Sequence, residues 1–220
     1  MKKALFNSFY LLVILSLFFA VSCKKEKDDT GVTPNNPEEK GVVINGVRWA
    51  TRNVDAPSTF AANPEDAGMF YQWNRKVGWS STDPLVNHEC GSTWNPDKPT
   101  GNSWEKANDP CPTGWRVPTY EEEQSLVNTG SFWGELNGVK GRFFGTGNQR
   151  VFFPAAGNRD YSDGTLYNLG GLGSCWSSTP YGSEGVALLY FTSGNANAGA
   201  SDSFIRTYGF SVRCVSESFD

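Results

Sequence analysis

The sequence predicts an α+β domain of mostly antiparallel strands, with one or two helices, long loops and disulfide bridges. Short strand-like runs, separated by clusters of Gly, Asn, Asp and Ser, recur through the second half of the chain, a spacing typical of antiparallel sheets. Residues 119–127 carry the pattern of a helix start. Four cysteines follow Cys23, and an even number in an exported chain favours disulfides.

The N-terminus has the pattern of a bacterial lipoprotein signal peptide over residues 1–22. A basic start precedes an apolar run over residues 9–20, and small residues then lead to Cys23. Cleavage before this cysteine would leave it as the acylated first residue. A retained transmembrane anchor is the alternative, but a span needs about 20 apolar residues and this run is shorter. We expect a lipid-anchored protein of the outer membrane.

Residues 23–40 are predicted to form the acylated cysteine and a flexible tether. They consist of charges, Pro and Asn, with Val32 as their single aliphatic residue, so they cannot bury enough apolar surface to fold. The acids after the cysteine resemble the export signal of surface-exposed lipoproteins, which predicts surface exposure. A linker facing the periplasm is the alternative. One domain is expected over residues 41–216, with residues 217–220 as a tail.

The charge of the chain excludes one class of partner. There are 19 Lys and Arg against 23 Asp and Glu, a net charge of −4, and removal of the signal peptide makes the chain more acidic. Nucleic-acid binding needs a basic stripe, so no nucleic-acid partner is predicted. The lipid, rather than a basic patch, is expected to hold the protein at its membrane.

The first half of the domain begins with a predicted hairpin over residues 42–49. Its Asn45-Gly46 pair supplies the two positive-φ positions of a type I′ turn. Residues 68–73 are predicted to form a second strand. A long polar insertion follows over residues 75–110, and loops of that length are ordered by their own side chains or serve a function.

The predicted helix covers residues 120–127. Thr119 and Glu122 have the spacing of a capping box, and three acids sit where the helix N-terminus is positive. Glu121–Glu123 are therefore interpreted as helix-start residues rather than catalytic acids.

The second half of the domain is predicted to be a series of strands. In the last of them, Phe210, Val212 and Cys214 share one face while Ser211 and Arg213 share the other. Turns are expected at residues 145–148, 160–164 and 193–201. The predicted strands cover residues 139–144, 150–153, 186–191, 203–206 and 210–215.

The cysteines of the domain allow three disulfide connectivities. The preferred pairing joins Cys111 to Cys214 and Cys90 to Cys175. Zinc is the competing interpretation, but the sequence has no Cys-x-x-Cys pair and only one histidine near a cysteine. No metal site and no cofactor are predicted.

Catalytic residues are not predicted. His88 is the single histidine and lies beside Glu89 and Cys90 in the insertion, but a cysteine among disulfide partners is more often structural. Acids are plentiful, yet no spacing marks the carboxylate pair that a glycosidase needs.

Two kinds of ligand-binding residue are considered. Asp160 and Asp163 lie in a turn that offers oxygen ligands to calcium, although Asx-turn chemistry explains the same residues without an ion. Trp79, Trp94 and Trp104 in the insertion are candidates for stacking on sugar rings, with Trp94 the most favoured. Burial in the core is the favoured interpretation for each ring, because a Gly-rich domain with few aliphatic residues needs its aromatic rings inside, and Trp94 is the expected exception.

Six segments resemble a known family. They are similar, in order, to motifs of the Fibrobacter succinogenes major paralogous domain (FISUMP), which is common in exported lipoproteins of Bacteroidota. The resemblance covers about residues 42–215. The segments are Ile44–Val54, Gly68–Asn74, Asp109–Thr119, Phe153–Gly157, Trp176–Thr179 and Ser211–Val215.

The resemblance implies a C-type-lectin-like fold with a twisted antiparallel sheet and a helix after Trp115–Pro118. The run Trp115–Glu122 also resembles formylglycine-generating enzymes, but their reactive cysteine pair near the C-terminus is here reduced to Cys214. The family commonly has an aromatic residue where this chain has Cys175, which fits an extra bridge to Cys90. The carbohydrate signature of lectins is missing, so calcium-dependent sugar binding is not implied by the fold.

These observations predict a non-enzymatic binding or adhesion module for glycans or cell-surface proteins. Its ligand surface is expected in residues 78–105, 158–168 and 193–203. A structural or fimbria-associated assembly subunit is the first alternative and would show an exposed strand edge. An enzyme is the second and would show a pocket with paired carboxylates or His88. The residues expected to maintain the fold are Arg48, Trp73, Trp115, Arg116, Pro118, Trp176 and Arg213.

Overall fold

The computed structural model describes residues 38–183 and 185–218, so the signal peptide, Cys23 and most of the tether lie outside the described residues. Within these two ranges, no helix has the length and apolar character needed to cross a membrane. Glu39, which the sequence places in the tether, packs on the domain. Its carboxylate accepts hydrogen bonds from Gly41 N and Thr51 N and pairs with Arg52 Nε at 2.9 Å.

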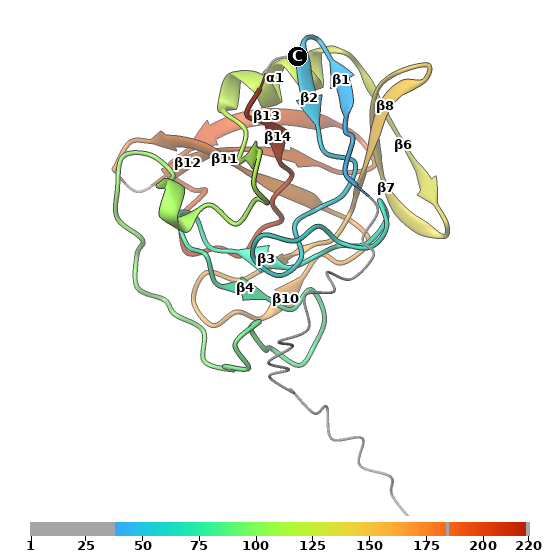
Figure 1. Cartoon of the computed structure of the whole chain (residues 1–220). Coiled ribbons are helices and arrows are strands. Elements are labelled where there is room, and N and C mark those ends of the chain that lie inside the picture. Colours follow the sequence, from blue (N-terminus) through green and yellow to red (C-terminus); the bar gives the residue numbers. More distant parts are fainter. Residues whose placement is uncertain (1–37, 184, 219–220) are drawn as a thin grey trace, which may run out of the picture. The chain divides into compact units, whose positions relative to one another are not determined.

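Five small antiparallel sheets and one α-helix make up the described residues (Figure 1). The sheets have the strand orders β1-β2-β14-β5, β3-β4, β6-β7-β8, β10-β9 and β11-β12-β13. The coarse prediction of antiparallel sheets with one helix and a disulfide is confirmed. The elements are β1 (Val42–Ile44), β2 (Val47–Trp49), β3 (Phe70–Tyr71), β4 (Gly78–Trp79), the 3-10 helix η1 (Lys106–Asn108), β5 (Trp115–Arg116), α1 (Tyr120–Asn128), β6 (Ser131–Leu136), β7 (Val139–Thr146), β8 (Gln149–Pro154), β9 (Asn158–Arg159), β10 (Leu166–Tyr167), β11 (Gly173–Tyr181), β12 (Gly185–Phe191), β13 (Ala196–Ser201) and β14 (Val215–Ser216).

Two hairpins close through Asn-Gly turns. Asn45 and Gly46 have φ values of 49° and 80°, which confirms the predicted type I′ turn between β1 and β2. Asn137 and Gly138, at 49° and 83°, make the same kind of turn between β6 and β7. Sequence analysis predicts β7 but not its partner β6.

The start of α1 is held by a side-chain cap. Thr119 Oγ1 accepts from Glu122 N at 3.3 Å, and Glu122 Oε2 accepts from Thr119 N at 2.8 Å, so the predicted capping box is confirmed. The Arg116 guanidinium holds the same Glu122 carboxylate with two hydrogen bonds of 2.8 and 2.6 Å. This ion pair raises the pKa of Arg116. β5 and the helix start are thereby joined.

Glu123 behaves differently from its neighbours in the first turn of α1. Its side chain is fully buried, and no described residue makes a hydrogen bond of normal geometry to either carboxylate oxygen. Burial raises the pKa of Glu123 well above its usual range, and the nearby Leu189 N–H opposes this only in part. Helix-start electrostatics therefore do not explain this acid, because its environment favours the neutral form.

Arg213 lies inside the domain rather than on an outer face. Residues 210–215 are all buried, and Val215 is the one residue of this predicted strand that belongs to a strand of the described sheets, β14. The guanidinium donates to Asn53 Oδ1 at 2.8 Å and to two backbone oxygens, and it lies 4.3 Å from the centroid of the Phe153 ring. Burial lowers its pKa to about 10. The hydrogen bonds compensate for the loss of solvent around this charge.

The end of the chain folds differently from its prediction. Residues 203–206 form a turn, with Phe204 N donating to Ser201 O, so the strand predicted there is wrong. The neighbouring residues 196–201, predicted as a turn, form β13 and pair with β12. Small residues such as Ala198 and Gly199 have low strand propensity, but β12 and α1 pack against β13 and override it.

The cysteines only partly follow the predicted pairing. The Cys111–Cys214 disulfide is present. The Cys90–Cys175 bridge is not formed, because Cys175 is a free thiol buried in the core on β11 while Cys90 lies on an exposed turn. Burial raises the pKa of the Cys175 thiol to about 12.

Candidate ligand pocket

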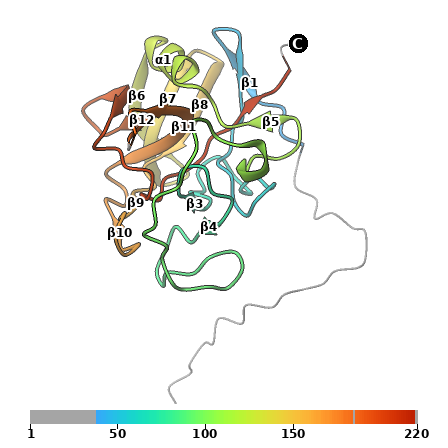
Figure 2. The same cartoon turned by 90° about the vertical axis from the view of Figure 1, so that its left-hand side faces the viewer.

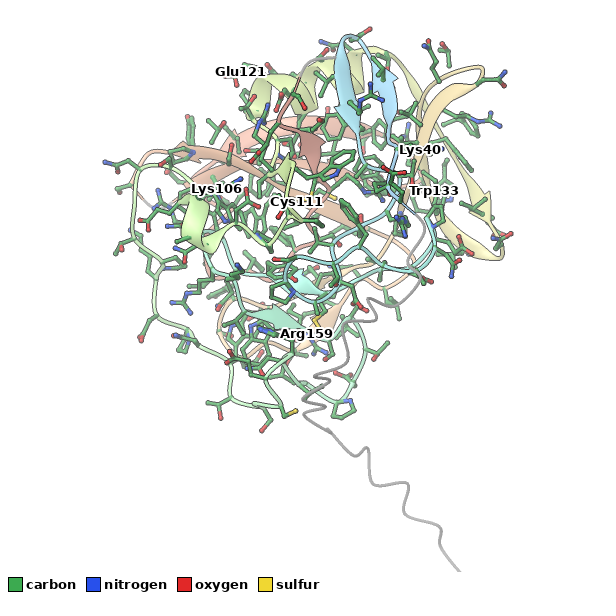
Figure 3. All side chains as sticks on the ribbon, in the orientation of Figure 1. Lys40, Lys106, Cys111, Glu121, Trp133 and Arg159 are labelled. Atoms are coloured by element: carbon green, nitrogen blue, oxygen red, sulfur yellow. A yellow bond between two sulfur atoms is a disulfide. The ribbon has the colours of Figure 1, made fainter. Side chains whose placement is uncertain are left out.

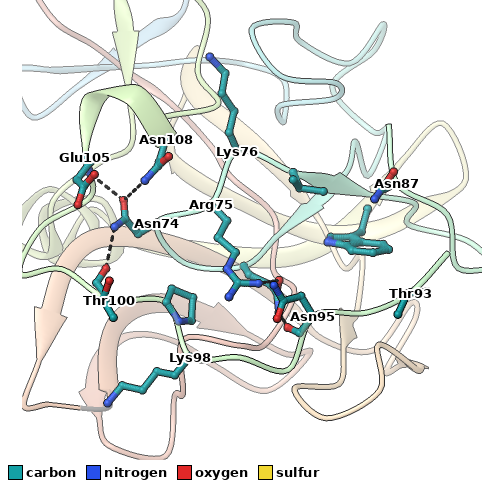
Figure 4. Close-up of a pocket in the computed structure, with 14 residues that line it drawn as sticks. Asn74, Arg75, Lys76, Asn87, Thr93, Asn95, Lys98, Thr100, Glu105 and Asn108 are labelled. Carbon is teal, nitrogen blue, oxygen red and sulfur yellow. Dashed lines mark hydrogen bonds between the residues drawn. The ribbon is translucent and has the colours of Figure 1, made fainter. Parts of the chain in front are cut away.

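A polar pocket of about 670 Å³ lies in the long insertion, and we call it the insertion pocket (Figure 4). Its lining includes Trp79 of β4 and Gln72, which directly follows β3. Both strands lie at the end of the domain away from α1 (Figures 1 and 2). Eleven of its 14 lining residues are polar: Gln72, Asn74, Arg75, Lys76, Asn87, Thr93, Asn95, Lys98, Thr100, Glu105 and Asn108.

The floor of the insertion pocket is built by two buried amides that follow β3. Gln72 Nε2 donates to Asn95 O at 2.6 Å. Asn74 Nδ2 donates to Thr100 O at 2.9 Å, while its Oδ1 accepts from Glu105 N at 2.8 Å. Short polar side chains of this kind hold irregular backbone in place where no sheet is available. The insertion is therefore held in one conformation from the side of β3.

The outer edge of the insertion is fixed from the opposite side by Arg159. This residue is fully buried, and it donates to Ser80 O at 2.9 Å and to Thr82 O at 2.5 Å (Figure 3). It also pairs with Asp83 at 3.1 Å. Residues 80–83 of the insertion are thus anchored to β9.

Charge in the insertion pocket is centred on Arg75. Figure 4 shows its guanidinium in the middle of the pocket, beside Asn95. Arg75 donates to Gln72 Oε1 at 2.9 Å and to Asp97 O at 2.5 Å. Burial lowers the pKa of Arg75, and the Asp97 charge opposes this effect. Lys76 and Lys98 add positive charge to the lining, and Glu105 is its single carboxylate.

The three tryptophans proposed as sugar platforms are core residues instead. The exposed fractions of Trp79, Trp94 and Trp104 are 3%, 6% and 9%. Trp79 and Trp94 pack on each other with ring centroids 5.0 Å apart, and Trp104 packs on Trp73 at 5.8 Å. Burial of these rings, the interpretation that the sequence favours, is confirmed, and Trp94 is no exception. The sugar-stacking role considered for them loses its support, because the insertion wraps over its own aromatic residues.

Asp160 and Asp163 serve the turn in which they lie. Asp160 Oδ1 accepts from Ser162 N at 2.9 Å, and Asp163 Oδ1 accepts from Thr165 N at 2.9 Å. The second hydrogen bond lowers the pKa of Asp163. These hydrogen bonds match the Asx-turn interpretation of the two residues, which needs no calcium ion. Across residues 38–183 and 185–218, no three His, Cys, Asp or Glu side chains gather in a way that would hold a metal ion.

His88 is a structural residue of the insertion. Its Nδ1 accepts from Gly78 N at 3.2 Å, and its backbone N donates to Gly78 O at 2.9 Å. These bonds tie the insertion to β4. The side chain is absent from the lining of the insertion pocket.

The motif residues are placed where a role in the fold is expected. Trp73 and Trp176 are fully buried, and their indole nitrogens donate to Ser177 O at 3.0 Å and Tyr71 O at 2.6 Å. The Pro118 carbonyl accepts from Ser178 N at 2.7 Å. These contacts connect segments far apart in the chain.

Comparison of the chain with protein-family models, curated proteins and solved structures gives no match. The FISUMP resemblance and the C-type-lectin-like fold therefore stay predictions that rest on the order of the motifs.

The insertion pocket lies in a region where sequence analysis expects a ligand surface, and Trp79 is the one candidate tryptophan among its lining residues. The insertion pocket falls largely within the predicted stretch 78–105. Its amides were missed because Asn, Thr and Pro between turns indicate loop structure and not a cavity. The available signal was the density of amide and cationic side chains in residues 72–76 and 87–108.

Proposed function

We propose that this protein is a non-enzymatic glycan-binding module, held by the lipid on Cys23 at the outer surface of the cell. The observation that carries the proposal is the polar lining of the insertion pocket. Amide, hydroxyl and guanidinium groups donate and accept hydrogen bonds in fixed directions, which suits the many hydroxyl groups of a sugar chain. The volume of about 670 Å³ is that of a pocket for a small ligand.

The lining residues favour binding over catalysis. Glycoside hydrolysis needs two carboxyl groups on either side of the scissile bond, and Glu105 is the single carboxylate in this lining. His88 is engaged with Gly78. A binding module needs none of this machinery, so it is the simplest function for the pocket.

We also propose membership of the FISUMP family with a C-type-lectin-like fold. Support comes from the six motifs in order and from α1, which follows the Trp115–Pro118 motif directly. Fold membership alone does not specify a ligand.

Glycan arrays test the proposed function. The purified mature protein in detergent should bind a subset of polysaccharides or host glycans. Changing Lys76→Ala and Thr93→Ala together should weaken that binding, because both side chains line the pocket and neither makes a hydrogen bond to a described residue. The matched control, Lys140→Ala with Thr146→Ala, alters exposed residues of the β6–β7–β8 sheet. Absence of any glycan ligand, or equal binding by both double variants, would reject the proposal.

Assembly is a second candidate function, favoured by one observation. β6 is at the edge of its sheet in the described residues. Phe132 on β6 is 47% exposed and stacks on Phe143 at 4.9 Å. An exposed edge with an aromatic residue is suited to strand addition. Analytical ultracentrifugation decides this point: wild-type protein should self-associate and the Phe132→Lys variant should not.

A further inference from the structure

A second cavity, of about 250 Å³, lies between the β11–β12 strands and the chain segment 203–210; we call it the aromatic pocket. Four aromatic residues line it: Tyr190, Phe204, Tyr208 and Phe210. It is separate from the insertion pocket, because the two sets of lining residues have no member in common.

The aromatic rings form two pairs. Tyr208 stacks on Phe210 with centroids 5.3 Å apart and planes 9° apart. Tyr190 packs on Phe204 at 5.5 Å. Tyr190, Phe204 and Tyr208 are only partly buried, so each keeps ring surface that a ligand can cover. Sequence analysis considered Trp79, Trp94 and Trp104 for stacking on a sugar ring. In the structure, Tyr190, Phe204 and Tyr208 offer aromatic surface for that role instead.

Two buried polar side chains of the aromatic pocket each have one group, the Asn158 Nδ2 amide and the Ser174 hydroxyl, without a hydrogen bond to a described residue. Asn158 is 5% exposed; its Oδ1 accepts from Asn168 Nδ2 at 2.9 Å, but its Nδ2 donates to no residue in 38–183 or 185–218. Ser174 is 4% exposed, and its hydroxyl makes no hydrogen bond within the same ranges. Neither atom is fully sealed from solvent. A polar group at this depth costs free energy unless a ligand or water pairs with it.

The chemistry of the lining restricts the ligand. No charged residue lines the aromatic pocket, so a charged ligand would lose its hydration without a counter-charge. A purely apolar ligand would leave Asn158 Nδ2 and the Ser174 hydroxyl without hydrogen-bond partners. The volume lies below the roughly 300 Å³ at which pockets for drug-sized ligands begin, so the occupant is a single ring.

We propose that the aromatic pocket binds one neutral hexopyranose ring of a glycan. Such a ring has apolar C–H faces for the aromatic walls and hydroxyl groups for Asn158 and Ser174. The inference rests on the proposed glycan-binding function and adds a site for one sugar residue to it. One hydrogen bond connects the two regions, since Gln72 of the insertion pocket donates to the backbone oxygen of Thr207, which precedes Tyr208 of the aromatic pocket.

Saturation-transfer NMR with methyl glycosides tests the aromatic pocket alone. The probes are the methyl α- and β-pyranosides of glucose, galactose and mannose, and methyl glucuronide is the charged comparison. The full mature protein in detergent should bind at least one neutral probe and reject the glucuronide. Ser174→Ala should weaken that binding about threefold to tenfold, the usual value of one hydrogen bond.

Aromatic variants complete the test. Phe204→Ala should abolish binding of the neutral probe, whereas the matched Phe132→Ala, which removes an exposed ring outside the pocket, should leave it unchanged. Circular dichroism should show that all variants are folded. If no neutral methyl glycoside binds, or if Ser174→Ala and Phe204→Ala bind it as wild type does, the inference is overturned.

The same variants separate this inference from the proposed function. In one outcome, the Lys76→Ala/Thr93→Ala variant loses array binding and the wild-type protein binds no methyl glycoside. This result would support the glycan-binding function and reject the sugar site in the aromatic pocket. Methyl glycoside binding that depends on Phe204, with array binding indifferent to Lys76 and Thr93, would move the glycan site to the aromatic pocket and remove the insertion pocket from the function.

Discussion

Gln72 and Thr207, 135 positions apart in the chain, are joined by a hydrogen bond of 3.1 Å from the amide to the backbone oxygen. The same amide nitrogen donates to Asn95 O at 2.6 Å, and its oxygen accepts from Arg75. One buried side chain therefore connects the insertion to the segment behind the aromatic pocket.

Replacing Gln72 should damage both stability and ligand binding. Gln72→Leu leaves the Asn95 and Thr207 carbonyl groups and the Arg75 donor without this partner, which we expect to cost about 1–3 kcal/mol. Thermal denaturation measures the loss. Gln124→Leu on the exposed side of α1 is the control and should change stability by less than about 0.5 kcal/mol. Equal effects of the two substitutions would show that Gln72 does not hold the insertion.

Glu123 should make stability depend on pH in one direction. Its folded-state pKa is raised above 4.5 by burial, so the folded protein holds this proton more tightly than the unfolded chain. The contribution is fully favourable below about pH 4.5 and is lost as the pH rises through the folded-state pKa. Glu123→Gln keeps the neutral shape and should raise the melting temperature at pH 7–8 by about 2–4 °C, the shift that 1 kcal/mol produces in a domain of this size.

The gain from Glu123→Gln should shrink as the pH falls toward 4. Melting temperatures of wild type and variant, measured from pH 4 to 8, give this difference directly. The neighbouring Glu121→Gln, at an exposed position, is the control and should show no such gain. A Glu123→Gln variant that is less stable than wild type at pH 8 would contradict the assignment of a buried neutral acid.

Cys175 should be unreactive in the native protein. It is a buried free thiol whose pKa is raised to about 12, so almost no thiolate forms at pH 8. Iodoacetamide followed by peptide mass spectrometry should find Cys175 unmodified in native protein and fully modified in guanidinium chloride. Rapid native labelling would mean that β11 opens or that the thiol is exposed.

The Cys111–Cys214 disulfide should contribute strongly to stability. It joins residues 103 positions apart, and closing a loop of this length stabilises by up to about 4–5 kcal/mol in the chain-entropy model. The double variant Cys111→Ala/Cys214→Ala should lose most of that value in chemical denaturation. Cys175→Ala is the comparison for a buried cysteine without a partner, and a similar loss there would assign the effect to packing instead of the cross-link.

Local features of the fold could be predicted from the sequence because their causes lie within a few residues. The Asn45-Gly46 turn and the Thr119–Glu122 cap depend on neighbouring side chains and backbone, and both have the expected geometry. β13 could not be predicted, because its small residues become a strand through pairing with β12.

The candidate site was harder to predict than the fold. Whether Trp94 faces solvent depends on the distant Tyr161, whose backbone oxygen accepts from the indole at 3.1 Å. The absence of a hydrogen bond to a described residue at Asn158 Nδ2 and at the Ser174 hydroxyl is likewise a property of the folded structure. Nothing in the sequence around Asn158 or Ser174 sets them apart from other Asn and Ser residues. The sequence indicated which segments form loops, but not which side chains those loops bring together.

The position of the Cys111–Cys214 bridge also decides how the protein responds to proteolysis. A cut at the exposed turn of residues 161–163 falls between the two cysteines, so both fragments stay joined and separate on a gel only after reduction. A cut in the exposed stretch 95–98 falls outside the bridged segment, so this bridge does not hold the two pieces together. Cleavage within the region of the aromatic pocket would thus leave its fragments covalently joined, whereas cleavage within residues 95–98 would produce two pieces that the Cys111–Cys214 bridge does not connect.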